Sequence, residues 1–405
     1  MFINIAFRNI FRQKRRSILT GLSISAGYVL FALTLSLIEG SYSNMIKLFT
    51  ENHIGHIQIH SDDYLTRPKI YKSINDKSKI EQTLSADKRV ISFTPRAYSP
   101  ALSFSDEKTG PVQLIGIDPE KEPTVSRLRE KITEGSFFNE PQDASDKVHA
   151  LISKGLAIKL GLEINDEFVL IGQGADGSIA NDIFIVSGTV GSKSSPDKRS
   201  VYVPLTTMQA FLSLDNNVHE YALLIGDISQ AQIVSQNLQS ELSDFVVSPW
   251  QVVEEVFFKS MEADKQGNWI FLALVMIIVF IGVLNTIFMS VLERTREFGV
   301  MRAIGFRAAG LVTLIFTETI LLTLLSLFLG ILVALPLVLW FSEVGYMFPE
   351  PMDMGGIEFQ HLKGELSFKV LFVPMGIVFL FATLTSALPA IRASRLTPVD
   401  ALGRF

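Results

Sequence analysis

Four long apolar runs alternate with polar segments along the chain. They are Ile18–Ile38, Trp269–Leu292, Leu311–Phe341 and Val370–Ile391. A bilayer core of about 30 Å is crossed by about 20 apolar residues in a helix, so each run is long enough to span a membrane. Backbone groups in hydrocarbon need internal hydrogen-bond partners, and these runs are therefore predicted to be transmembrane helices.

The long segment between the first and second runs has the mixed polarity of a folded soluble domain. Strict alternation over Ile54–His60 predicts a strand. Further strands are expected at residues 112–117, 168–171, 183–186, 201–203 and 221–225, and helices at 153–160, 206–214, 229–242 and 249–265. The predicted fold class is therefore a membrane α-helical protein with four transmembrane helices and a large α+β domain.

Positive charge gathers beside the ends of the apolar runs. Residues 1–16, 293–307 and 392–405 carry 12 basic and 3 acidic side chains, whereas the rest of the chain holds the other 24 of 36 basic and 38 of 41 acidic residues. Short cytoplasmic flanks are enriched in Lys and Arg. Both termini and the 293–307 loop are therefore predicted to be cytoplasmic, with residues 41–266 on the other side.

The resulting segments follow in chain order. They are a cytoplasmic interfacial helix (1–16), the first span (17–40), the α+β domain (41–266), the second span (267–292), a cytoplasmic loop (293–310), the third span (311–341), a short outer loop (342–367), the fourth span (368–391) and a cytoplasmic tail (392–405). The interfacial helix has an apolar face of Ile3, Phe7, Ile10 and Phe11, opposite Arg8, Arg12 and Arg15. The first apolar run is too long for a secretory signal and lacks a cleavage site, so it is expected to be retained.

Composition and motifs exclude several kinds of chemistry. The chain has no cysteine and no G-x-x-x-x-G-K-[ST] phosphate-binding loop, so ATP binding through its own P-loop is not expected. It also lacks H-E-x-x-H and G-x-S-x-G, and we predict that it is not an enzyme. His53, His56 and His60 lie close together, but a solvated strand face explains them better than a metal site.

The loop after the second span combines charge with apolar side chains. Glu293, Arg294, Arg296, Glu297 and Arg302 alternate with Phe298, Met301 and Ile304, and Gly305 is placed to end a short helix. A simple positive connector would need only charge. The apolar residues suit a groove on a partner protein, so the loop is a candidate docking segment.

Three segments of the sequence resemble those of a known family. The segment Glu293–Phe306 looks like the coupling segment of MacB/FtsX/LolC-type ABC transporter permeases, and Pro389–Leu402 and Ala6–Ser17 match that family's closing and opening segments. The resemblance implies two permeases, identical or paralogous, and two ATPase subunits that dock on the coupling segment. It also implies a porter-plus-Sabre outer domain, and ATP and Mg²⁺ bound only by the ATPase partner. Glu51–His60, Leu114–Pro119 and Ile152–Leu162 resemble the LolC/LolE lipoprotein-releasing branch.

Two features inside the spans are candidates for function. Tyr28, Phe31 and Leu35 share one helix face and are candidates for a cleft that shelters acyl chains, with ordinary packing or contact with lipid as the alternative. Glu318 lies inside the third span, where a carboxylate needs a partner, and Arg302 or a Ser/Thr hydroxyl is a candidate.

The predicted function is that of a permease in the bacterial inner membrane. It would couple ATP hydrolysis by a separate subunit to release of lipoprotein or lipid towards a periplasmic carrier. The alternatives are a MacB-like exporter of peptides or antibiotics and an FtsX-like regulator of a cell-wall hydrolase. Membrane lipids are expected partners, and nucleic acid is not.

Overall fold

The computed structural model describes residues 2–12, 14–106, 108–138, 148–192, 198–354 and 357–395. It separates into two compact units. The helical unit contains the chain up to Asn44, Met261–Pro351 and the chain from Gln360 onwards. The sheet unit contains Met45–Ser260 and Met352–Phe359. Each unit is described here by itself.

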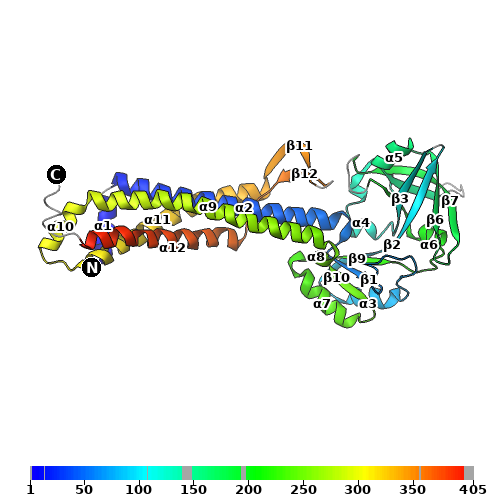
Figure 1. Cartoon of the computed structure of the whole chain (residues 1–405), viewed down its shortest axis with the longest axis horizontal. Helices are drawn as coiled ribbons and strands as arrows, with labels where there is room; N and C mark the ends of the chain where they lie inside the picture. The colour runs from blue at the N-terminus through cyan, green and yellow to red at the C-terminus, as the bar shows by residue number, and fades with distance from the viewer. Residues whose placement is uncertain are drawn as a thin grey trace. The chain divides into compact units, whose positions relative to one another are not determined.

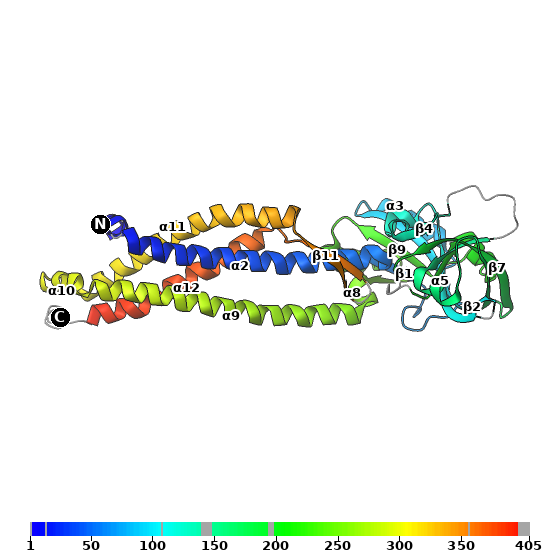
Figure 2. The same cartoon turned by 90° about the horizontal axis from the view of Figure 1, so that it is seen from above.

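The helical unit is built from the ends of the chain. Its helices are α1 (Phe2–Arg12), α2 (Lys14–Phe49), α9 (Glu255–Glu293), α10 (Thr295–Ala303), α11 (Ala308–Glu343) and α12 (Phe368–Arg395). Four of them, α2, α9, α11 and α12, are long and apolar enough to cross a membrane, which confirms the four predicted spans. Figure 2 shows the short α10 joining α9 to α11.

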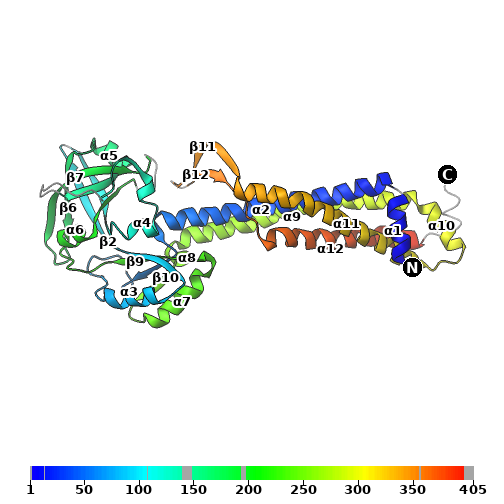
Figure 3. The ribbon, with the colours of Figure 1, turned by 180° about the vertical axis from the view of Figure 1, so that it is seen from behind.

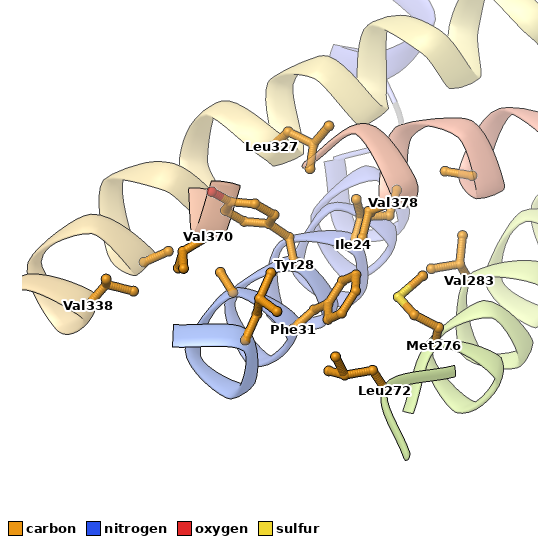
Figure 4. Close-up of a cluster of buried hydrophobic side chains, with 14 of the residues drawn as sticks. Ile24, Tyr28, Phe31, Leu272, Met276, Val283, Leu327, Val338, Val370 and Val378 are labelled. Carbon is orange, nitrogen blue, oxygen red and sulfur yellow. The ribbon is translucent and has the colours of Figure 1, made fainter. Parts of the chain in front are cut away.

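Helix α2 packs against the other three long helices. Ile24, Tyr28 and Phe31 of α2 contact side chains of α9, α11 and α12 in one buried apolar cluster (Figure 4). Helices α11 and α12 lie side by side over most of their lengths (Figure 3). At one end of the unit the Tyr42 hydroxyl donates to Asp264 at 2.7 Å, which ties α2 to α9. The long helices therefore form one packed bundle.

The first helix presents apolar side chains in two directions. Ala6 and Ile10 are buried, and α1 packs against α11. Ile3, Phe7 and Phe11 are each more than half exposed, as an interfacial helix requires. Ile10 lies on the predicted apolar face beside Ile3, but it is buried because α1 packs against α11, so only part of that face is exposed. The short loop before α12 also contains an unpredicted hairpin, β11 (Tyr346–Met354) and β12 (Ile357–Leu362).

The described residues of the sheet unit include one sheet of ten strands. They are β1 (Ile57–His60), β2 (Val90–Ser105), β3 (Lys108–Ile117), β4 (Ile132–Gly135), β5 (Val148–Ser153), β6 (Glu167–Gln173), β7 (Ile179–Val190), β8 (Ser200–Pro204), β9 (Glu220–Ile225) and β10 (Val246–Pro249). The helices and helical turns of this unit are η1 (Thr50–Ile54), α3 (Lys77–Ala86), α4 (Glu122–Val125), η2 (Arg129–Lys131), α5 (Lys154–Leu160), α6 (Leu205–Phe211), η3 (Ile228–Gln230), α7 (Ala231–Glu241) and α8 (Trp250–Val253). The mixed α+β fold that was predicted is confirmed (Figure 1).

Strand pairing divides this sheet into a closed ring and an open layer. The order is β10-β1-β9-β2-β3-β8-β5-β7-β4, and β6 pairs with both β2 and β7. The strands β2, β3, β8, β5, β7 and β6 therefore form a closed ring, whereas β10, β1 and β9 extend from β2 as an open layer. The long strand β2 belongs to both, since its first half pairs with β9 and its second half with β3 and β6.

A buried ion cluster lies where β2 passes from the layer to the ring. Arg96 is fully buried, and its guanidinium donates to Glu122 at 2.7 and 2.9 Å and to Glu220 at 3.0 Å. It also donates to the backbone carbonyl of His53, at the end of η1. One side chain thus connects β2, α4, β9 and the helical segment that precedes β1.

Both faces of β1 are buried, contrary to the sequence-based prediction. Strand β1 is paired on both edges, with β10 and β9. His56 is 8% exposed and His60 is 2% exposed, so the solvated face predicted for them is wrong. The strand also begins later than predicted, because Ile54 ends η1 and Gly55 follows with φ +76°.

Candidate functional site

The segment that follows α9 is fixed to α11 by one arginine. Arg294 lies between α9 and α10, and only 7% of its side chain is exposed. Its Nη1 donates to both carboxylate oxygens of Glu318 on α11, at 2.8 and 2.7 Å. Its Nε donates to Glu297 on α10, at 3.0 Å. Arg294 is therefore a partner of the acid inside the third span, whereas Arg302, the predicted candidate, donates to the carbonyl of Phe306.

The inner face of α10 belongs to the packed core. Phe298 is 1% exposed and lies in an apolar cluster with Val291, Leu311 and Ile315, against which Met301 packs. The guanidinium of Arg294 lies over the Phe298 ring, at 5.1 Å from its centre. The inward position of Phe298 means that this side chain is not free to enter a partner's groove.

The opposite face of α10 is exposed. Ile304 is 81% exposed and Val300 is 43% exposed, and the exposed Arg296 lies one turn before Val300. This spacing of four residues places the three side chains on one helix face. We call this set, together with the exposed Glu293 and Glu297, the α10 face.

The end of α10 has the geometry expected of its glycine. The helix ends at Ala303, and Gly305 has φ +99°. The Phe306 N–H donates to the carbonyl of Met301 at 3.0 Å, and Arg302 donates to the carbonyl of Phe306 at 3.2 Å. Such a turn closes a helix with a residue in the left-handed region, which favours glycine. Arg302 therefore caps this turn.

The cavity beside Arg294 and Glu318 is small. Its volume is about 30 Å³, and Ser17, Thr20 and Thr319 also line it. Such a volume holds about one water molecule and no substrate. The buried ion pair is thus a structural brace, and it does not lie in a binding pocket.

A larger pocket lies between α2, α9 and α12. Its volume is about 470 Å³, and apolar and aromatic residues line it. The residues are Phe31, Trp269, Leu272, Ala273, Met276, Ile277, Phe280, Ile281, Ile377 and Phe381. Pockets that hold small ligands usually have volumes of about 300–1,000 Å³. The pocket therefore has room for an apolar group.

Of the three residues predicted to form a cleft, only Phe31 lines this pocket. Tyr28 and Leu35 are buried in the bundle cluster, and the Tyr28 hydroxyl donates to the carbonyl of Leu371 at 3.3 Å. Tyr28 also packs closely on Gly330, where an added Cβ would lie 2.8 Å from its ring. The predicted face is thus wrong for Tyr28 and Leu35. The pocket is formed mainly by α9, which sequence reasoning did not consider.

Comparison with known proteins identifies the family. A model of the MacB-like periplasmic core domain matches residues 17–254, and a model of the FtsX-like permease C-terminal region matches residues 269–398. This chain belongs to the MacB/FtsX-type ABC transporter permeases.

The permease contains no group of three or more His, Cys, Asp or Glu placed to hold a metal ion among its described residues.

The relatives of this permease carry two kinds of name. It is 29% identical to the macrolide export ATP-binding/permease protein MacB of Nitrobacter winogradskyi, over 67% of this chain and 41% of MacB. It is 23% identical to the lipoprotein-releasing system transmembrane protein LolC of Xylella fastidiosa, over 78% of each chain. The permease thus spans about two fifths of the MacB relative, and the two names differ in cargo.

Solved structures of related outer regions are also similar to it. One is the periplasmic region of MacB from Actinobacillus actinomycetemcomitans, with 16% identity over 50% of this chain and 94% of that chain, and a TM-score of 0.36. Another is the extracellular domain of the noncanonic ABC-type transporter YknZ, with 17% identity over 47% of this chain and 97% of that chain, and a TM-score of 0.33.

Proposed function

We propose that this permease works with a separate ATPase, which docks on the α10 face from the cytoplasm, and that the complex moves lipid or lipid-anchored protein out of the inner membrane. In this proposal both termini are cytoplasmic and the sheet unit is periplasmic, as the distribution of basic residues favours. ATP and Mg²⁺ are bound by the ATPase, and a second permease completes the complex. A periplasmic carrier receives the cargo.

The brace between α10 and α11 supports a mechanical role for the docking segment. A displacement of α10 is passed to α11 through Arg294, because its guanidinium is bonded to both Glu297 and Glu318. The buried Phe298 adds an apolar contact in the same direction. An ATPase that moves the α10 face would therefore move a spanning helix with it.

The apolar pocket is the observation that carries the choice of cargo. Each CH₂ group of an acyl chain costs about 0.8 kcal/mol to expose to water, so a long chain needs a sheltered route out of the bilayer. The pocket offers such shelter beside Phe31, with Trp269 and Phe381 partly exposed around it. A lipid-attached cargo fits this lining better than a polar peptide does.

Two pairs of variants test the proposal. V300D/I304D places charge on the α10 face, and we expect at least a tenfold loss of stimulated ATPase activity in proteoliposomes containing the ATPase. I179D/I233D, at two exposed positions of the sheet unit, is the matched control. A273W fills the apolar pocket and should block transfer of a fluorescent triacylated lipopeptide to an acceptor, whereas A309W at an exposed position of α11 should not. Normal activity of V300D/I304D would refute docking, and normal transfer by A273W would refute the cargo route.

Export of a macrolide-like compound is the second candidate, and the similarity to MacB favours it. The same reconstituted complex distinguishes the two candidates. Transport of a radiolabelled macrolide, without transfer of the lipopeptide, would support export and contradict the lipid proposal.

A further inference from the structure

A second pocket lies in the sheet unit, where β2 passes from the layer to the ring. We call it the junction pocket. Its volume is about 430 Å³. Residues 98–100 of β2 and 111–113 of β3 form one side, and the loop that follows β1 forms the other. The rings of Pro68, Pro100 and Pro111 line it together with Ile70 and Val112, so much of its wall is apolar.

The loop side of the pocket is held in place by a buried histidine. His219 is fully buried, and its Nδ1 accepts from the Tyr98 N–H at 2.9 Å. Its Nε2 lies 2.9 Å from the carbonyl oxygen of Ile70, so Nε2 carries the proton and donates. The Tyr64 ring stacks between two histidine rings, and its centre lies 5.5 Å from that of His60 and 5.1 Å from that of His219. Both walls of the pocket are therefore joined to one rigid network.

One ion pair and two hydrogen bonds fix the path of the loop and its neighbour further. Lys72 donates to Asp63 and to the carbonyl of Arg67, which closes the loop on itself. On the β2 side, the Tyr98 hydroxyl donates to Glu220 at 3.2 Å. A pocket with its walls held in this way loses little conformational entropy when a ligand binds.

The charged side chains that line the junction pocket have one sign. Lys69, in the loop that follows β1, and Arg199, directly before β8, are both exposed and both line it. Within the described part of the chain, neither forms an ion pair, and no carboxylate is among the lining residues. Two cations near an apolar wall favour a ligand with a negative group on an apolar body.

We propose that the junction pocket binds a small organic anion, with its carboxylate or phosphate between Lys69 and Arg199 and its apolar part against the proline rings. This binding site is separate from the α10 face and from the apolar pocket of the helical unit. It gives the sheet unit a ligand of its own, whichever cargo the permease moves.

Calorimetry on the full chain in phosphatidylcholine nanodiscs tests this proposal. The probes are phenyl phosphate and phenylacetate, which carry the two anionic groups, and benzylamine, which carries the opposite charge on the same ring. We expect saturable binding of at least one anion and none of benzylamine. The tighter of the two anions identifies the preferred group.

Charge-reversal variants locate the site. K69E/R199E should weaken binding of the anion at least tenfold. K88E/K159E makes the same change of charge at exposed positions outside the lining and should leave the affinity unchanged. Gln113→Trp fills the pocket without changing its charge and should also weaken binding at least tenfold. Absence of saturable anion binding, equal binding of benzylamine, or unchanged affinity in K69E/R199E or Gln113→Trp would each overturn the proposal.

Discussion

The brace at Arg294 yields a quantitative prediction, because the same guanidinium pairs with one largely buried and one exposed carboxylate. The side chain of Glu318 is 14% exposed, whereas that of Glu297 is 50% exposed. Removing one partner of a buried ion pair leaves an uncompensated charge and costs about 3–5 kcal/mol. An exposed pair contributes only about 0.2–1 kcal/mol.

Replacement by methionine converts this contrast into a double-mutant cycle. R294M should lower the free energy of unfolding by about 3–5 kcal/mol, and E318M should cost an amount near the lower end of that range, because Arg294 keeps Glu297 as a partner. R294M/E318M should lose far less than their sum, since an apolar pair of similar size often replaces a buried ion pair at little cost. The coupling energy should therefore reach at least about 2 kcal/mol.

Thermal unfolding of the purified permease, followed by tryptophan fluorescence, measures these differences. For a unit of about 150–250 residues, 1 kcal/mol shifts the midpoint by about 2–4 °C, so each single variant should unfold about 6–20 °C earlier. The control E297M should shift the midpoint by less than about 4 °C. Additive shifts for R294M and E318M would refute the brace, and so would an E297M shift as large as that of E318M.

Three further predictions concern the sheet unit. Acid should destabilise it, because burial lowers the pKa of His56 to about 4, opposed in part by its hydrogen bond to Ile225, while the unfolded chain binds the proton near pH 6.5. The contribution of His56 to stability is therefore lost as pH falls below about 6.5, by about 2 kcal/mol at pH 5. Hydrogen exchange of β1 amides should show a larger loss in the native chain than in His56→Asn, in which His53 and His219, whose pKa values burial also lowers, still respond to acid. Gly55→Ala should cost about 2 kcal/mol or more, since Gly55 has φ +76° and its added Cβ would lie 3.1 Å from a carbonyl oxygen; an unchanged unfolding midpoint would contradict this. Arg96→Met leaves Glu122 buried without its cation and should cost about 3–5 kcal/mol, whereas a loss below about 1 kcal/mol in denaturant titration would show that the ion cluster is not stabilising.

The spans were predictable because length and apolarity alone determine which segments can cross a bilayer. Short strands with uninterrupted apolar runs, such as β8 and β9, were also predicted from the sequence. The longest strand, β2, was missed because Pro95, Arg96 and Pro100 interrupt its pattern. Its central arginine is paired with carboxylates from α4 and β9, far apart in sequence, and no local pattern signals such a partner.

The candidate site was predictable as a segment and less so residue by residue. The sequence placed a short helix with a terminal glycine after the second span, and α10 has that form. Helical spacing alone did not show which side of it faces the bundle, so Phe298 was expected outside and is buried. The partner of Glu318 was missed because Arg294 precedes α10, and only the chain reversal between α9 and α11 brings the two side chains together. The burial of His56 and His60 was misjudged, since pairing of β1 on both edges and burial of both its faces depend on distant segments of the chain.

Site-specific photocrosslinking tests the central claim that a separate ATPase docks on the α10 face. A benzophenone amino acid at Ile304 should crosslink, in cells of the native host, to a subunit that mass spectrometry identifies by its nucleotide-binding motif. The same group at Ile179, which is equally exposed in the sheet unit, should give no such product. An ATPase adduct at Ile304 alone is the predicted result, whereas no adduct at Ile304, or the same adduct at both positions, would contradict it.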